Sequence, residues 1–284
     1  MGSNTSRATI RMTYDADGPT VSMTEAMRYD LETSERLLKE RKLSLIVDLD
    51  QTIVHATVDP TVGEWMDEAS QFAERRRLRL EGLPKEANVT SESQVVDEEE
   101  DVNPNWAALS DVKRFKLGGE GLPLGANGQE DGSWYYIKPR SARVRFVYYF
   151  SGRIMTIDCR RPGLLDFLSG LKHKYEMHVY TMGTRAYALE VCKAIDPDQS
   201  VFNNRVLTRD ESGSTFGSSL HPLLHPTSLV FSGMTSKNLQ RLFPSDQSMV
   251  AIIDDRSDIW AEVPNLVKVN PCAFVIASRR LQNK

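Results

Sequence analysis

The sequence has few cysteines, no long apolar run and no excess of basic residues, and each absence excludes a class of protein. Its three cysteines among 284 residues have neither zinc-ligand spacing nor a disulfide framework, which favours a reducing, intracellular compartment. No apolar stretch approaches the roughly 18 residues of a membrane-spanning helix, and the first residues lack the apolar block of a signal peptide. We therefore expect neither membrane insertion nor secretion.

The charge balance excludes a broad basic surface. Lysine and arginine total 35 against 39 aspartates and glutamates, for a formal net charge of -4. Proteins that bind nucleic acid directly usually carry a basic field, so we expect no direct nucleic-acid contact. An anionic ligand must then be held by a few local basic side chains. With 40% hydrophobic and 26% charged residues, the composition is typical of one large globular domain or a domain with insertions.

The chain alternates predicted helices and strands, which favours an α/β fold with a parallel sheet flanked by helices. Residues 1–21 are polar and predicted to be flexible, whereas Ser22 with Glu25 resembles a capping box that begins the globular domain 22–284. Helices are predicted over 22–42, 63–82, 161–175, 184–196 and 236–243, and strands over 43–47, 133–140, 176–183, 205–213, 248–260 and 266–271.

An insertion over 60–133 follows the first strand. Its helical segment carries a cluster of four arginines between positions 75 and 79, which we interpret as a solvated face. An acidic stretch over about 84–104, with five consecutive acids at 97–101, is predicted to be a disordered loop.

Polar residues follow several predicted strands at the point where each strand ends. The apolar run 43–47 ends abruptly in Asp48 and Asp50, and carboxylates this close repel each other and are costly to desolvate. In parallel sheets ligands bind outside the carboxyl ends of the strands. A divalent cation with hard oxygen ligands, such as Mg²⁺, would neutralise these acids and point to phosphoryl chemistry. The strand-end residues are Asp48, Asp50, Thr181, Asp254 and Asp255.

The segment "DLDQT" matches the DxDxT signature of the haloacid dehalogenase (HAD) superfamily of phosphatases. The segments "SLIVDLDQTIVHATVDPTVGEW", "YEMHVYTMGTRAYALEVCKAIDPD", "RVLTRDESGS", "KNLQRLFP" and "MVAIIDDRSDIW" more closely resemble the catalytic domain of FCP-type RNA polymerase II carboxy-terminal-domain phosphatases. The resemblance spans roughly residues 22–271. It implies a HAD-like, Rossmannoid parallel sheet with insertions after the first catalytic strand.

The resemblance also implies a role for each matching residue. Asp48 would be the nucleophile that becomes an aspartyl phosphate, and Asp50 the general acid and then the base. Thr181 and Lys237 would hold the transferring phosphoryl group, so we expect Lys237 beside Asp48. Asp255 best fits a direct Mg²⁺ ligand, and Asp254 would bind through water or position its neighbour. Asp48 and Asp50 would complete the site, and the metal would also take the backbone carbonyl of Asp50.

Further matching positions are expected to bind phosphate or substrate. They are Thr52, Arg140, Arg161, Tyr187, Arg209 and Arg256. Either Arg140 or Arg161 takes the family role. Instead of binding substrate, Arg209 could form an ion pair with Asp210 or Glu211, and Tyr187 could be a packing aromatic. His178, inside an apolar strand, is interpreted as a core residue.

The implied function is hydrolysis of phosphoserine in the heptad-repeat tail of RNA polymerase II, in the nucleus, with TFIIF as a recruiting partner. Relatives usually carry a BRCT domain after the catalytic part, and none is recognised before residue 284, so we expect that recruiting element to be absent. Two alternatives stay open: a small-molecule phosphatase of the same superfamily, and a phosphopeptide-binding scaffold with impaired catalysis.

Two segments, 141–160 and 215–234, interrupt motifs that are continuous in the family. Both are apolar for surface loops. They are either translated introns or lineage-specific extensions. In the first, Ser151-Gly152 lies between alternating runs and predicts a β-hairpin.

Overall fold

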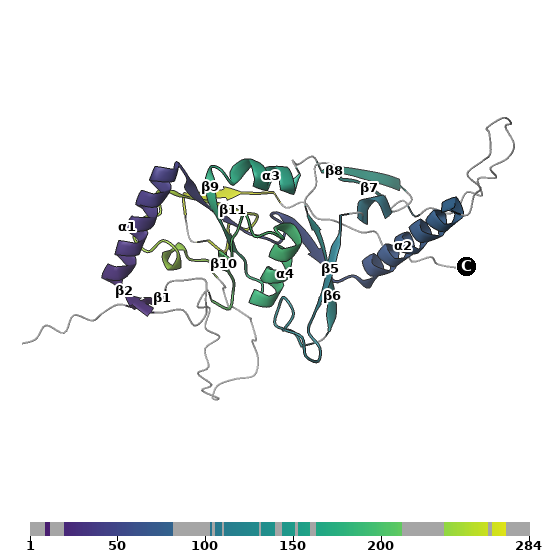
Figure 1. The fold of residues 1–284 in the computed structure, drawn as a ribbon, viewed down its shortest axis with the longest axis horizontal. Helices are drawn as coiled ribbons and strands as arrows, with labels where there is room; N and C mark the ends of the chain where they lie inside the picture. The colour runs from purple at the N-terminus through teal and green to yellow at the C-terminus, as the bar shows by residue number, and fades with distance from the viewer. Residues whose placement is uncertain are drawn as a thin grey trace, which may run out of the picture.

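A five-stranded parallel sheet forms the centre of the computed structural model, with strand order β10-β9-β3-β11-β12 (Figure 1). Its strands are β3 (Leu43–Val47), β9 (Tyr175–Tyr180), β10 (Val206–Leu207), β11 (Val250–Asp254) and β12 (Leu266–Lys268). The α/β fold class with a parallel sheet, predicted from the sequence, is thereby confirmed. The structure describes residues 9–11, 20–81, 103, 106–109, 111–130, 132–139, 144–150, 153–159, 163–211, 236–260 and 263–270.

Both faces of this sheet are buried, because successive residues of a strand point to opposite sides. In β3, Leu45 and Val47 pack in the core cluster formed with α3 (Leu164–Leu171) and α4 (Arg185–Ile195). Ile46 packs in a second cluster on the other face. Each fully buried aliphatic side chain stabilises the fold by roughly 1.5–3 kcal/mol. This explains why β3 is aliphatic throughout and why a polar residue can follow only where the strand leaves the core.

Helix α1 (Met23–Glu40) begins as its sequence predicts, with the Ser22 hydroxyl accepting a hydrogen bond from the Glu25 amide at 3.2 Å. It ends at Arg41 in the left-handed conformation. Arg36 then joins the helix to β9 through two hydrogen bonds of 2.9 Å to the Glu176 carboxylate. A two-stranded pairing of β1 (Thr9–Arg11) with β2 (Thr20–Ser22) precedes α1, so the segment predicted to be flexible is not irregular throughout.

The described residues between 54 and 139, a region that contains the predicted insertion 60–133 and is called the insertion from here on, form a second, antiparallel sheet in the order β4-β6-β5. Helix α2 extends from this sheet, away from the central one, and its last nine residues are exposed (Figure 1). Within its arginine cluster, exposed Arg77 pairs with Glu74 and Glu81, as on a solvated face. The elements are β4 (Val54–Thr57), α2 (Pro60–Glu81), the 3₁₀ turn η1 (Trp106–Leu109), β5 (Lys113–Leu117) and β6 (Ser133–Pro139).

The hairpin predicted around Ser151-Gly152 is present, with β7 (Val144–Phe150) antiparallel to β8 (Arg153–Cys159). The insert 215–234 and nearly all of the acidic stretch 84–104 lie outside the described residues. One prediction is wrong: no α-helix covers 236–243, where only a short 3₁₀ turn, η2 (Leu239–Arg241), forms. In the part of the chain that the structure describes, no helix is long and apolar enough to span a membrane.

His178 lies in β9 and is 4% exposed, as expected of a core residue. Its ring packs edge-on against Phe243, with a centroid distance of 5.8 Å, and its Nε2 atom is 3.8 Å from the Glu176 carboxylate. Burial lowers the pKa of His178 from 6.5 to about 3, although the Glu176 charge opposes that shift. The folded protein therefore keeps this imidazole neutral.

Replacing His178 is expected to remove part of the acid sensitivity of the fold. As the pH falls through 6.5 the unfolded chain binds a proton that the folded chain excludes, so stability is lost from about pH 6.5 downward. Between pH 7 and pH 5 this loss is about 2 kcal/mol. Urea unfolding should show this loss of stability in the parent protein and in the exposed-residue control His173→Gln, but not in His178→Gln. Equal pH dependence in all three proteins would contradict the assignment.

Candidate active site

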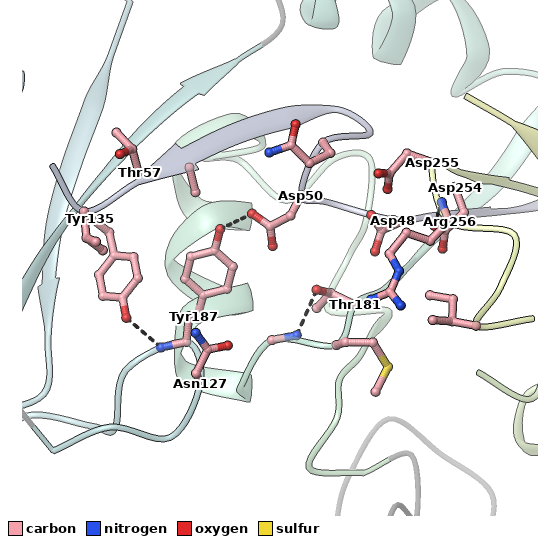
Figure 2. Close-up of a pocket in the computed structure, with 17 residues that line it drawn as sticks. Asp48, Asp50, Thr57, Asn127, Tyr135, Thr181, Tyr187, Asp254, Asp255 and Arg256 are labelled. Carbon is pink, nitrogen blue, oxygen red and sulfur yellow. Dashed lines mark hydrogen bonds between the residues drawn. The ribbon is translucent and has the colours of Figure 1, made fainter. Parts of the chain in front are cut away.

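Three neighbouring strands of the central sheet bring the predicted site residues together at their carboxyl ends. Asp48 follows β3, Asp254 ends β11 and Thr181 follows β9. All three line a pocket of about 540 Å³ (Figure 2). Its other lining residues are Asp50, Gln51, Ala56, Thr57, Val58, Ala126, Asn127, Tyr135, Met182, Gly183, Tyr187, Asp255, Arg256 and Ile259.

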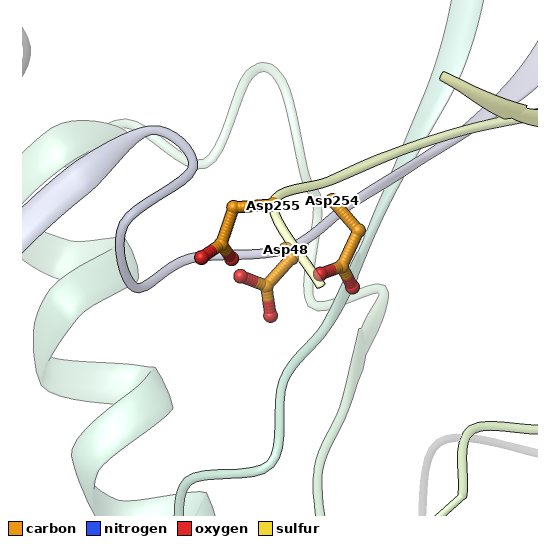
Figure 3. Close-up of side chains that lie close together, drawn as sticks. All are labelled: Asp48, Asp254 and Asp255. Carbon is orange, nitrogen blue, oxygen red and sulfur yellow. The ribbon is translucent and has the colours of Figure 1, made fainter. Parts of the chain in front are cut away.

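Asp48, Asp254 and Asp255 form a carboxylate cluster whose nearest oxygens all lie within 4.8 Å of one another (Figure 3). Asp48 is 7% exposed and Asp254 is fully buried. Burial, together with the Asp254 charge, raises the pKa of Asp48 to about 7, although Lys237 opposes the shift. Three hard oxygen donors at this spacing suit a divalent cation, which would restore full ionisation of Asp48.

Lys237 lies between two of these acids. Its Nζ atom is 2.7 Å from Asp48 Oδ1 and 2.6 Å from Asp254 Oδ2, which confirms the expected position beside Asp48. Burial disfavours the ammonium charge, yet the two carboxylates raise the pKa of Lys237 above its ordinary value. The rings of Tyr180 and Trp260 lie 5.5 and 5.6 Å from Nζ, so the charge also faces two aromatic surfaces. The lysine is thus charged and held in place.

Asp254 has hydrogen-bond donors on both carboxylate oxygens. Besides Lys237, it accepts the indole N–H of Trp260 at 2.9 Å and the backbone N–H of Arg256 at 2.8 Å. Such a carboxylate is oriented by its neighbours. Of the two roles expected for Asp254, binding the metal through water or positioning its neighbour Asp255, this geometry favours the second.

Thr52 contacts Asp255 and not the pocket. Its hydroxyl accepts the Asp255 backbone N–H at 3.0 Å and lies 3.3 Å from the Asp255 carboxylate. Thr52 is buried and is not among the pocket-lining residues. The threonine of the DxDxT motif therefore joins the two loops that carry Asp48 and Asp255, and the direct phosphate contact predicted for it finds no support in these contacts.

Asp50 lies apart from the three-acid cluster and accepts a hydrogen bond of 2.5 Å from the Tyr187 hydroxyl. The Asp50 side chain is thus not a member of that cluster, and the metal contact predicted for Asp50 through its backbone carbonyl stays a prediction. Burial raises the pKa of Asp50 even though the bond from Tyr187 opposes the shift. Burial and the Asp50 charge raise the pKa of Tyr187 well above its ordinary value, so the phenol stays protonated. Asp50 is therefore suited to carry a proton.

The β9–α4 turn completes this side of the pocket. Thr181 is 1% exposed, and its hydroxyl accepts the Gly183 backbone N–H at 3.1 Å. A Cβ atom at Gly183 would lie 2.7 Å from the Tyr187 ring, so only glycine allows this tyrosine to reach Asp50. The hydroxyl of Thr181 faces the pocket beside the acids (Figure 2).

Of the arginines predicted to bind phosphate or substrate, Arg209 and Arg256 lie among the described residues. Arg256 lines the pocket, but its exposed guanidinium bonds Asp258 at 2.6 Å. Arg209 does not line the pocket; its Nε atom lies 4.0 Å from Asp210, the alternative considered from the sequence. Glu211 instead pairs with Arg185 at 3.1 Å. Arg140 and Arg161 lie outside the described residues.

Sequence reasoning missed several residues at the site, among them Tyr180, Trp260, Thr57 and Asn127. Trp260 lies six residues after Asp254 within the quoted motif, and that spacing was the available signal. Nothing in the local pattern indicates Asn127.

A parallel sheet with carboxylates, a threonine and a lysine at the ends of neighbouring strands defines an α/β protein with a HAD-like phosphatase site. A family model described as NLI interacting factor-like phosphatase matches residues 135–276. The chain belongs to this family.

Comparisons with individual proteins agree with this assignment. The chain is 40% identical to the RNA polymerase II C-terminal domain phosphatase of Schizosaccharomyces pombe over 96% of its length, and 36% identical to that of Saccharomyces cerevisiae over 90%. It spans 27% and 26% of those two relatives.

Two solved structures of Fcp1, an RNA polymerase II CTD phosphatase, are similar to this fold. One is a fission yeast variant bound to beryllium fluoride, with a TM-score of 0.54 and 40% identity. The other has a TM-score of 0.55 and 39% identity. The matches cover 86% and 88% of this chain and 45% and 48% of those chains.

Removing the buried ammonium is expected to destabilise the fold when no metal is bound. In Lys237→Met, Asp48 and Asp254 lose the cation between them, which typically costs about 3–5 kcal/mol. Urea unfolding with a metal chelator should show this loss, whereas the exposed-lysine control Lys193→Met should stay within about 0.5 kcal/mol of the parent. A loss below about 1 kcal/mol in Lys237→Met would show that the carboxylates do not depend on this ion pair.

Proposed function

We propose that the chain is a Mg²⁺-dependent protein serine phosphatase that acts on the heptad-repeat tail of RNA polymerase II through an aspartyl-phosphate intermediate. The observation that carries the proposal is the position of Asp48, bonded to Lys237 and clustered with Asp254 and Asp255. A carboxylate nucleophile must meet a phosphate dianion, and only local positive charge permits that approach.

The first half of the reaction transfers the phosphoryl group to the protein. An Asp48 oxygen forms a bond to phosphorus while the bond from phosphorus to the serine oxygen breaks. Asp50, whose pKa is raised by burial, gives its proton to the departing serine oxygen. Lys237 and the Thr181 hydroxyl stabilise the charge on the other phosphoryl oxygens.

The second half returns the protein to its starting state. Asp50, now a carboxylate, takes a proton from a water molecule whose oxygen attacks phosphorus, and the bond between phosphorus and Asp48 breaks. Orthophosphate leaves and Asp50 is protonated again. Tyr187 donates to Asp50 in both halves and fixes the orientation of its carboxylate.

The carboxylates fit a divalent cation. Asp48 and Asp255 would hold the ion, with Asp254 orienting its neighbours. When bound, Mg²⁺ supplies positive charge that neutralises phosphoryl oxygens and keeps Asp48 ionised. The donors are all hard oxygens, and this chemistry favours Mg²⁺ over softer metals.

The nature of the substrate follows from the relatives and from the shape of the site. The yeast relatives are named as phosphatases of the RNA polymerase II C-terminal domain. Among the described residues no separate domain covers the pocket, which suits a peptide better than a small molecule. The scaffold alternative supposes that Lys237 or Arg161 is displaced. The Lys237 ammonium bonds Asp48 at 2.7 Å, which disfavours the first form of this alternative, and Arg161 lies outside the described residues. A nuclear location and an association with TFIIF follow as parts of this proposal.

Phosphate release from a phosphorylated heptad-repeat peptide tests the proposal. We expect turnover that needs Mg²⁺ and that falls by at least about 10³-fold in Asp48→Asn, because an amide cannot attack phosphorus. Asp198→Asn, at an exposed acid outside the pocket, is the matched control and should retain activity. Turnover of Asp48→Asn within tenfold of the parent would refute the nucleophile.

The acid role of Asp50 predicts a dependence on the leaving group. Asp50→Asn should reduce the hydrolysis of a serine phosphate by about 10²–10⁴-fold, because the serine oxygen needs a proton to depart. The hydrolysis of an aryl phosphate whose phenol has a low pKa should be reduced much less. The two rates are compared under the same Mg²⁺ concentration, and equal losses on both substrates would rule out general-acid catalysis by Asp50.

A further inference from the structure

The pocket continues beyond the residues that the proposed chemistry uses. Figure 2 shows the acid cluster at one end, and Thr57, Tyr135 and Asn127 toward the other. This second end is built by the insertion: Thr57 ends β4, Tyr135 lies in β6, and Asn127 lies in the loop between β5 and β6. A bare phosphate would occupy only the acid end, which leaves room for the rest of a larger substrate.

The β5–β6 loop is held firmly against the pocket. The Tyr135 hydroxyl accepts the Ala126 backbone N–H at 2.9 Å. From the start of α4, Thr184 donates its backbone N–H to the Ala126 carbonyl at 3.1 Å and its hydroxyl to the Gly125 carbonyl at 3.2 Å. The residues that precede Asn127 are thereby bound to both the insertion and the central domain.

The loop also requires glycine at two positions. A Cβ atom at Gly125 would lie 2.4 Å from the Gln129 side chain and 2.7 Å from the Tyr135 hydroxyl. Gly128 has a φ of +83°, in the region that favours glycine. These constraints leave Asn127 at the tip of a tight, preorganised turn.

Asn127 has an amide available for a ligand. Its backbone N–H is already bound to Gln129 Oε1 at 3.0 Å, but among the described residues its exposed side-chain amide forms no hydrogen bond. The hydroxyls of Thr57 and Tyr135 at this end are both engaged, because they accept the backbone N–H of Asp59 at 3.2 Å and of Ala126 at 2.9 Å. Asn127 is therefore the group at this end best placed to bind a polar ligand.

We propose that Asn127 forms a peptide-binding subsite that recognises the main chain of the substrate beside the phosphoserine. A side-chain amide offers both donors and an acceptor, and a peptide group offers one of each, so the two are complementary. Val58, which also lines the pocket and is 54% exposed, gives an apolar surface for a neighbouring substrate side chain. The inference rests on the proposed function and adds to it a reason for preferring peptides over free phosphate monoesters.

Peptide binding to a protein that cannot turn over tests the subsite without requiring catalysis. The Kd of a fluorescent phosphorylated heptad-repeat peptide is measured for Asp48→Asn, with and without a second substitution, Asn127→Ala. We expect the second substitution to raise the Kd about five- to tenfold, the usual effect of losing one or two neutral hydrogen bonds. Glu120→Ala, at an exposed residue of the same loop outside the pocket, should leave the Kd unchanged.

Turnover by otherwise unaltered protein provides the second readout. Asn127→Ala should lower kcat/KM for the peptide five- to tenfold, by about the same factor as the Kd changes. For O-phosphoserine and p-nitrophenyl phosphate, kcat/KM should stay within about twofold of the parent value. An unchanged peptide Kd, or equal losses on all three substrates, overturns the subsite. Peptide binding that depends on Asn127 without any turnover by the parent protein supports the subsite and overturns the proposed phosphatase function alone.

Discussion

The ion pair of Lys237 with Asp48 and Asp254 is the interaction on which the active site depends. Three strand ends and the segment before η2 meet there. The carboxylates of Asp48, Asp254 and Asp255 carry more negative charge than one ammonium can neutralise. Without Lys237, two buried carboxylates a few ångströms apart would repel each other strongly in a medium of low dielectric constant. With it, the remaining negative charge is what a divalent cation can neutralise. The same ammonium thus supports the fold and prepares the site for a phosphate.

The turn after β3 separates the two carboxylates of the DxDxT motif into different environments. Gln51 adopts a φ of 61°, and the amides of Ile53 and Val54 both bond the Leu49 carbonyl at 3.0 Å. This tight turn sends Asp50 toward Tyr187, while Asp48 stays with the acid cluster. Two acids of identical chemistry thus meet different electrostatic environments, because one has a phenol as its neighbour and the other an ammonium.

The parts of the structure that could be predicted from the sequence are those set by local pattern. The aliphatic run of β3, the Ser22 cap of α1 and the polar strand ends are each visible within a few residues. The errors concern pairings between distant segments. Asp50 and Tyr187 are 137 residues apart, and Lys237 sits in a bridge with Trp260 where helical spacing predicted an α-helix. Backbone bonding to that strand-like partner outweighs weak local helix propensity, and no short-range pattern reveals such a partner.

Helix α4 connects the two ends of the pocket through its first turn. Its cap, Thr184, bonds the Ala126 and Gly125 carbonyls of the insertion, and Tyr187, one turn later, donates to Asp50 of the central domain. The Tyr135 ring, whose hydroxyl also holds the loop, packs 5.5 Å from the Tyr187 ring. A rigid helical turn joins these contacts, so the loop cannot move away without disturbing the tyrosine that orients the acid. The insertion is therefore mechanically part of the active site, although the strand ends that carry the acids belong entirely to the parallel sheet.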